Sequence, residues 1–308
     1  ALTVPGEAYV AYMLEKLHKG ESIFAEYKEA AVADAYKRLI FPALEREIRN
    51  ELTEKADEGA IKIFAVNLKN LLLQAPLAGH VIMGLDPGYR TGCKMAIIDA
   101  QGNVLDYGAY YLTASDRQRQ EAQKRLAALI KKYKVSLLSI GNGTASYETE
   151  QFVSKMIEEE GLACHYIITN EAGASVYSAS KLAIDELPDL DVTIRGAVSI
   201  ARRIQDPLAE SVKIDPKSIG VGQYQHDVNQ KLLTSTLDQV VETVVNHVGV
   251  ELNTASPAIL QHVAGISSAV AKNIVAYRHD QGAFASRKQL LKVPRLGPAA
   301  FTQCAGFL

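Results

Sequence analysis

A carboxylate at the end of an apolar run is the residue of this sequence that most clearly could do chemistry. Asp86 follows the apolar run 81–85, a Pro87-Gly88 turn comes next, and a second apolar run begins after Lys94. Two short apolar runs joined in this way are typical of adjacent strands, so we expect Asp86 at a strand end. An acid placed there is a suitable first ligand for Mg²⁺ or Mn²⁺ in phosphoryl transfer, provided that further oxygen ligands lie nearby.

One further acid follows a predicted buried strand. The apolar run 165–169 continues into Asn170-Glu171, which makes Glu171 a candidate second ligand. The buried run before it ends at Ile140 and continues into Gly141-Asn142-Gly143, which has no carboxylate. Because a two-metal site needs three or four carboxylates, this set is incomplete.

The other acids nearby are weaker candidates. Glu148 and Glu150 fall in the first turn of a predicted helix, where acids are common because they oppose the helix dipole. The start of a later helix offers Arg195 where the last acid is expected, and Asp191 and Asp206 are the nearest substitutes.

Three interpretations of the carboxylate pair stay open. In the first, Asp86 and Glu171 are the vestige of a catalytic and metal site, and no cofactor is required. In the second, the pair holds Mg²⁺ or Mn²⁺ and serves a structure-selective nuclease. In the third, residues 86–92 are the phosphate loop of an actin-like ATPase, but the sequence has no convincing second phosphate loop or adenosine site.

The elements that must position these acids follow an α/β order. We predict strands at 81–85, 94–99 and 104–110, a helix at 116–133, a strand at 135–140, a helix at 147–160 and a strand at 165–169. Three antiparallel strands followed by α-β-α-β is the order of the ribonuclease H-like fold, which has a mixed sheet.

The sequence on both sides of this region has helical spacing. We predict a helical region at 1–79, the ribonuclease H-like domain at 80–205, linking helices at 206–249 and a tandem helix-hairpin-helix module at 250–308. The expected fold class is therefore α/β plus all-α.

The C-terminal part contains a near-repeat of a tight turn. The first copy reads Val263-Ala264-Gly265-Ile266-Ser267 and the second reads Val293-Pro294-Arg295-Leu296-Gly297, and each precedes small residues that begin a helix. Such a hairpin exposes the N–H groups of the second helix, where the helix dipole favours a phosphate. We expect nucleic-acid contacts from Gly265, Ile266, Ser267, Ala269, Lys272, Arg295, Gly297 and Pro298. Packing against a partner protein is the alternative.

The charge distribution supports contact with nucleic acid. The net charge is −2, yet residues 258–308 have Asp280 as their one acid and carry the cations Lys272, Arg278, Arg287, Lys288, Lys292 and Arg295. No apolar run reaches roughly 18 residues, so we expect no membrane span. Three scattered cysteines favour a reducing cytoplasm. The sequence does not begin with Met, and we expect it to be part of a longer protein.

Longer motifs resemble a known family. Residues 84–94, 141–146, 170–178, 215–227 and 252–256 are similar to the Tex family of bacterial transcription accessory proteins, and the resemblance covers essentially the whole sequence. It implies a YqgF-type, RuvC-related domain with a ribonuclease H-like fold, helix-hairpin-helix modules and a role in transcription. It also implies a C-terminal OB-fold RNA-binding domain that this sequence does not include.

The resemblance also bears on individual residues. Asp86 matches the first acid of the YqgF and RuvC relatives and Glu171 best matches the acid after the third-site strand, whereas the second and last acids are missing. The residues expected to line a phosphate-binding face are Arg90, Lys94, Arg202 and Arg203, with an ordinary surface charge as the alternative for each.

The predicted function is sequence-independent nucleic-acid binding by a Tex-like factor whose ribonuclease H-like domain is not catalytic. The expected partners are RNA, DNA or both, together with RNA polymerase or other transcription components, in the cytoplasm. The alternative is the metal-dependent nuclease that uses Asp86 and Glu171.

Overall fold

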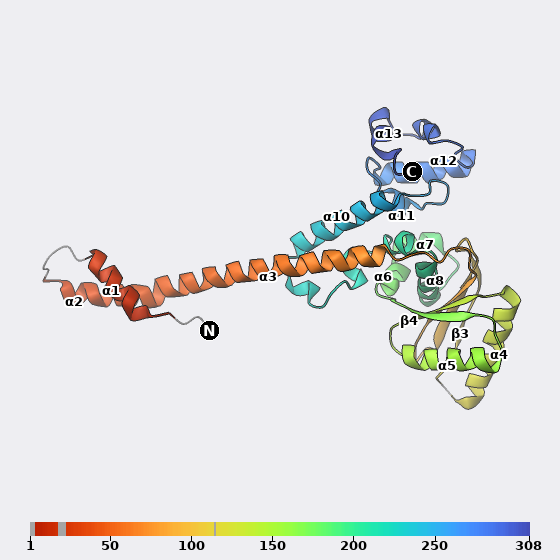
Figure 1. The fold of residues 1–308 in the computed structure, drawn as a ribbon, viewed down its shortest axis with the longest axis horizontal. Coiled ribbons are helices and arrows are strands. Elements are labelled where there is room, and N and C mark those ends of the chain that lie inside the picture. Colours follow the sequence, from red (N-terminus) through yellow and green to blue (C-terminus); the bar gives the residue numbers. More distant parts are fainter. Residues whose placement is uncertain (1–3, 18–22, 114) are drawn as a thin grey trace. The chain divides into compact units, whose positions relative to one another are not determined.

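The computed structural model describes residues 4–17, 23–113 and 115–308. The chain forms two compact units, Ala1–Lys62 and Ile63–Leu308 (Figure 1). Among the described residues, no helix is both long enough and apolar enough to cross a membrane.

The first unit is helical, as its apolar spacing predicts. Its elements are α1 (Gly6–Leu17), α2 (Ala25–Ala35), the π-helical turn η1 (Tyr36–Ile40) and the first part of α3 (Phe41–Leu72). No described residue between 4 and 60 is buried, and apolar side chains such as Leu44 and Leu52 stay exposed. The last turns of α3 belong to the second unit, where Leu68 and Leu72 are buried.

A mixed five-stranded sheet is the centre of the second unit. Its strands are β1 (Ile82–Asp86), β2 (Cys93–Ile98), β3 (Val104–Tyr110), β4 (Leu137–Gly141) and β5 (His165–Thr169), and their order is β3-β2-β1-β4-β5. The first three strands pair antiparallel, while β4 is parallel to both β1 and β5. This order confirms the predicted ribonuclease H-like sheet.

Helices cover both faces of the sheet. On one face, α4 (Asp116–Tyr133) and α5 (Ser146–Glu159) pack over Met83 and Leu85 of β1. On the other face, α8 (Val192–Gln205) packs over Ile82 and Ala96. Successive side chains of a strand point to opposite faces, so Asp86 lies on the α8 side with Ile82.

Gly84 allows α8 to approach the sheet closely. A Cβ atom at Gly84 would lie 2.2 Å from the carbonyl oxygen of Ala197, and 3.0 Å from the backbone nitrogen of Ala201. Both neighbours are backbone atoms, which cannot rotate away as a side chain could. The glycine therefore fixes how near α8 lies to the strand that carries Asp86.

Short helices connect the sheet to the C-terminal region. They are α6 (Ala174–Ala179), α7 (Lys181–Glu186), α9 (Pro207–Ser211) and the 3₁₀ turns η2 (Pro216–Ile219) and η3 (Gln225–Asp227). The amphipathic α10 (Gln230–Val248) follows, with Leu233, Leu237 and Val241 on its buried face. The C-terminal elements are α11 (Pro257–Leu260), α12 (Ser268–Gln281), the 3₁₀ turn η4 (Arg287–Lys292) and α13 (Pro298–Cys304). They confirm the predicted helical module with two hairpins.

Candidate nucleic-acid interface and carboxylate pair

Asp86 lies at the C-terminal end of β1, where the sequence predicts it. Its Oδ2 atom lies over α8 at Gly196, where a Cβ would come within 3.0 Å of that oxygen. Burial and the negative charge of Glu171 raise the pKa of Asp86 to about 6, and the charge of Lys94 opposes that rise. Asp86 therefore shares its electrostatic environment with Glu171, and the structure brings the two predicted acids together.

Glu171 follows β5 and reaches toward the loop after β4. Its backbone N–H donates to Asn142 Oδ1 at 3.1 Å, and the N–H of Gly143 donates to its carboxylate. A Cβ at Gly143 would lie 1.7 Å from Glu171 Oε1, and one at Gly141 would lie 2.2 Å from Oε2. The carboxylate therefore occupies the space that a side chain after β4 would need. Burial raises the pKa of Glu171.

Three of the weaker acids, Glu148, Asp191 and Asp206, have other partners in the structure. Glu148 accepts a hydrogen bond from the Tyr89 hydroxyl at 2.6 Å. Asp191 and Asp206 cap the N-termini of α8 and α9 by accepting from the backbone N–H groups two and three residues ahead. These contacts give each acid a structural role that does not involve Asp86.

The residue of α8 that faces Asp86 is Gly196, which corrects the expectation of Arg195 at this place. Arg195 instead donates through Nε to the carbonyl oxygen of Leu187 at 3.1 Å and through Nη1 to that of Ser178 at 3.3 Å. One residue of helix turns a side chain by about 100°, so neighbouring positions on α8 face different parts of the fold.

The donor set does not fit a two-metal centre. Among the described residues, no group of three or more His, Cys, Asp or Glu side chains could hold a metal ion. Asp86 and Glu171 supply two carboxylates, and glycines occupy the loop after β4 and the facing turn of α8, where further ligands would have to come from.

The four predicted phosphate-binding residues have different surroundings. Arg90 is exposed. Lys94 is buried and donates to the carbonyl oxygens of Thr91 and Gly92. Arg203 is also buried, which corrects the expectation of a surface position. Its Nη1 points into the fold and donates to two carbonyl oxygens beside Glu171. The structure thus leaves Arg90 as the exposed member of these three.

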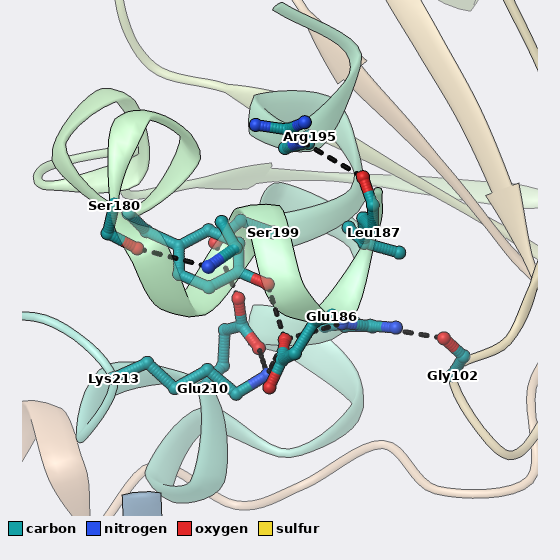
Figure 2. Close-up of polar contacts among 11 residues, drawn as sticks. Gly102, Ser180, Glu186, Leu187, Arg195, Ser199, Glu210 and Lys213 are labelled. Carbon is teal, nitrogen blue, oxygen red and sulfur yellow. Dashed lines mark hydrogen bonds and ion pairs between the residues drawn. The ribbon is translucent and has the colours of Figure 1, made fainter. Parts of the chain in front are cut away.

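Arg202 belongs to a partly buried polar cluster that sequence patterns did not reveal. Its Nε donates to the carbonyl oxygen of Gly102 at 3.0 Å, and its Nη1 lies 3.4 Å from Glu186. Lys213 Nζ lies 3.0 Å from both Glu186 and Glu210, and Glu210 accepts from Ser199 (Figure 2). The cluster ties α7, α8 and α9 together. Glu186 lies 16 residues from Arg202 and 27 residues from Lys213 in the sequence, so no local spacing marks the cluster.

The two predicted hairpins have the same local conformation. Gly265 adopts φ +79° and Arg295, at the equivalent position of the second hairpin, adopts φ +66°. In both turns the next residue donates its N–H back to the first one, from Ile266 to Val263 and from Leu296 to Val293. The left-handed conformation suits glycine and strains arginine.

Each hairpin also contacts the helix that follows the other hairpin. Asn273 of α12 donates through Nδ2 to the carbonyl oxygen of Pro294 at 2.8 Å. In return, Gly265 lies so close to α13 that a Cβ there would come within 2.8 Å of Gln303 Cβ. The two turns are therefore held in a fixed relation to each other.

The exposed cations of this module are fewer than its composition suggests. Arg278 donates through Nη1 to the carbonyl oxygens of Leu252 and Ala255, so its side chain stabilises the loop before α11. The predicted contact residues Lys272 and Arg295 are exposed. Also exposed are the predicted contacts Gly265, Ser267, Ala269, Gly297 and Pro298, while Ile266 is buried.

Asn246 of α10 is a positioning residue that sequence reasoning missed. Its Oδ1 accepts from the N–H of Ala264 at 2.9 Å, and its Nδ2 donates to the carbonyl oxygen of His262 at 2.9 Å. These bonds fasten the first hairpin to α10. A single asparagine on an amphipathic helix gives no sequence signal for this role.

Comparison with known proteins identifies both parts. The model of the Tex protein YqgF-like domain matches residues 80–205, and the helix-hairpin-helix motif matches residues 245–308. Protein tex of Bordetella pertussis is 56% identical over 270 residues, which cover 87% of this chain and 34% of that protein. Transcriptional accessory protein Tex of Neisseria gonorrhoeae is 55% identical over 276 residues, or 89% of this chain and 36% of that protein.

A human relative is similar over a comparable share of the chain. S1 RNA-binding domain-containing protein 1 of Homo sapiens is 49% identical over 278 residues, which are 89% of this chain and 28% of that protein. The chain thus spans well under half the length of these three relatives. It is a Tex-like protein that combines a Tex YqgF-like domain with a helix-hairpin-helix region.

Proposed function

We propose that this chain is the nucleic-acid-binding part of a Tex-like transcription factor and that its hairpins hold the phosphate backbone without reading bases. The observation that carries this proposal is the pair of mutually braced hairpins with exposed Lys272 and Arg295 beside them. The N–H groups of the exposed Ser268 and Ala269, at the start of α12, have no partner within the helix, whereas that of Val270 donates to the capping Ser267 Oγ at 3.3 Å. Backbone N–H groups, a helix dipole and a nearby cation together attract a phosphate diester.

The names of the relatives support the same assignment. One relative is named for an S1 RNA-binding domain and another is named a transcriptional accessory protein. On this proposal the chain works with RNA, DNA or both in the cytoplasm and contacts RNA polymerase or another transcription component.

The YqgF-like domain then serves as a non-catalytic scaffold. Two carboxylates remain from the nuclease pattern, and the space for another after β4 is taken by Glu171 itself. A metal-dependent nuclease is the second candidate, because Glu171 lies close enough to Asp86 for its charge to raise the pKa of Asp86. The donor set described above favours the scaffold.

Fluorescence anisotropy with labelled duplex DNA, single-stranded DNA and RNA of two unrelated sequences tests the binding proposal. We expect similar affinities for both sequences of each type, and a steep fall with salt as counterions are released. Lys272→Glu and Arg295→Glu should each weaken binding about tenfold at low salt and make the salt dependence shallower.

A matched control separates local contact from net charge. Lys124 is an exposed lysine on α4, so Lys124→Glu makes the same charge change outside the hairpin module. We expect its effect to be less than about twofold. Equal losses in all three variants, or an affinity that does not respond to salt, would contradict the proposal.

A further inference from the structure

Two buried cations accompany the Asp86–Glu171 pair. Lys94 is 9% exposed and Arg203 is 6% exposed. Lys94 is the register partner of Asp86 across β1 and β2, and both side chains lie on the α8 face of the sheet. The charge of Lys94 acts on Asp86, and the charge of Arg203 acts on Glu171. Each acid therefore has a cation of the same chain beside it.

Hydrogen bonds to carbonyl oxygens hold each cation in place. Lys94 Nζ donates to Gly92 at 3.0 Å and also to Thr91. Arg203 Nη1 donates to Asn170 and to Ala172, both at 2.7 Å, and these residues flank Glu171 in the chain. Neither cation is free to swing out when another ion approaches the acids.

The surroundings of Arg203 and Glu171 contain unpartnered atoms of opposite charge. Arg203 Nε and Nη2 and Glu171 Oε2 are buried, and none has a hydrogen-bond partner in the described part of the chain. Buried charges are costly unless an opposite charge lies near them. The charges of Glu210 and Glu171 both favour the charged form of Arg203, and the charge of Arg203 in turn favours ionised Glu171, so each reduces the cost of burying the other.

We propose that Lys94 and Arg203 permanently offset part of the charge of the Asp86–Glu171 pair, in the place that divalent ions take in a metal-dependent nuclease of this fold. A divalent ion at the pair would be repelled by two fixed positive charges, which already weaken the attraction of the two carboxylates for it. This inference rests on the proposed scaffold role of the YqgF-like domain. It gives a physical reason why Asp86 and Glu171 would not bind a divalent metal ion.

Isothermal titration of the whole chain with MnCl₂ tests the proposal. We expect no saturable Mn²⁺ binding by the wild-type chain at millimolar concentration. Lys94→Gln and Arg203→Gln should each bind Mn²⁺ at least about tenfold more tightly than the wild-type limit. Lys94→Arg keeps the charge and should behave as wild type. The gain of Lys94→Gln should vanish in Lys94→Gln/Asp86→Asn, which removes one of the two acids.

Two results would overturn the proposal. One is saturable Mn²⁺ binding by the wild-type chain that disappears in Asp86→Asn. The other is a folded Lys94→Gln chain, verified by circular dichroism, that binds Mn²⁺ no better than wild type. If neither single variant folds, restored folding in Lys94→Gln/Asp86→Asn supports the pairing, and continued misfolding contradicts it. Nucleic-acid affinity, measured on the same wild-type sample, tests the proposed function separately.

Discussion

The carboxylate of Glu171 fills the space that a side chain at Gly143 would need. A Cβ at that position would lie 1.7 Å from Glu171 Oε1. The second acid of a nuclease would have to come from this loop after β4, so the present position of Glu171 and an acid at residue 143 are mutually exclusive. The absence of an acid after β4 therefore follows from the position that the Glu171 carboxylate occupies.

Gly143→Ala should displace the Glu171 side chain. The carboxylate is the end of a flexible side chain, so we expect a moderate loss of about 1 kcal/mol in the free energy of unfolding, mainly from the lost Gly143 N–H bond. Urea denaturation measures it. The same substitution in a Glu171→Ala chain should cost less than half as much, and equal costs in the two backgrounds would show that the residues do not compete for space.

Gly84→Ala should cost more, because the clash is with backbone. The new Cβ would lie 2.2 Å from the carbonyl oxygen of Ala197, which α8 holds in place. We expect a loss of about 3 kcal/mol in the free energy of unfolding. A loss below that of Gly143→Ala in urea denaturation would contradict the close approach of α8 to β1.

Asp86 should make stability depend on pH between about 4 and about 6. Its folded pKa of about 6 lies above the ordinary value of 3.8, so the folded protein binds this proton more tightly than the unfolded chain does. The contribution of Asp86 therefore falls as the pH rises through this window. Asp86→Asn should be more stable than wild type by about 2 kcal/mol at neutral pH, and the difference should shrink toward pH 4.

Urea denaturation of both proteins across this pH range measures the effect. Glu148→Gln is a control whose difference from wild type should stay nearly constant between about pH 5 and about pH 6, because the Tyr89 hydroxyl lowers the pKa of Glu148 from its ordinary value of 4.5 and any effect of its titration lies below that pH. A stability difference between Asp86→Asn and wild type that does not change with pH would contradict the burial of this carboxylate.

Arg295→Gly should separate the charge of the second hairpin from its conformation. Arg295 adopts φ +66°, which glycine adopts without strain, so the free energy of unfolding should rise by about 1 kcal/mol. Affinity for nucleic acid should fall several-fold, because a cation is lost. Thermal melts and anisotropy titrations of one preparation give both values. Lower stability, or unchanged affinity, would contradict the assigned role of Arg295.

Lys213→Met should destabilise the polar cluster of α7, α8 and α9. Lys213 lies 3.0 Å from Glu210, whose side chain is 3% exposed, so its removal leaves a buried carboxylate without its ion pair. We expect a loss of about 3 kcal/mol in the free energy of unfolding. Lys155→Met breaks the exposed pair with Glu159 and should change it by less than about 0.5 kcal/mol. Equal losses of stability in Lys213→Met and Lys155→Met would contradict a stabilising role of the Lys213–Glu210 ion pair.

Local patterns were sufficient to predict the sheet and its helices. Apolar runs separated by Pro-Gly and Gln-Gly-Asn turns placed the strands to within two residues, because strand and helix periods differ clearly. The proximity of Asp86 and Glu171 could also be predicted, because β1 and β5 both run parallel to β4, so the acids that follow them lie at the same end of the sheet. The predicted division into 1–79, 80–205, 206–249 and 250–308 stays a prediction.

Other parts of the candidate site depend on contacts between distant residues. Nothing near Arg203 in the sequence indicates that it bonds to carbonyl oxygens more than thirty positions away. Nor does the sequence indicate that Asn246 fastens the first hairpin, or that Gly196 rather than Arg195 faces Asp86. Charge and spacing give the residue types, whereas packing decides which way each side chain points.

A gel assay with end-labelled duplex, single-stranded and four-way-junction DNA and matching RNA in Mn²⁺ tests the central claim most directly. The wild-type chain and Asp86→Asn should retard the same substrates equally and leave them intact, and Lys272→Glu/Arg295→Glu should not retard them. Cleavage by the wild-type chain that Asp86→Asn abolishes would contradict a binding scaffold and identify a nuclease.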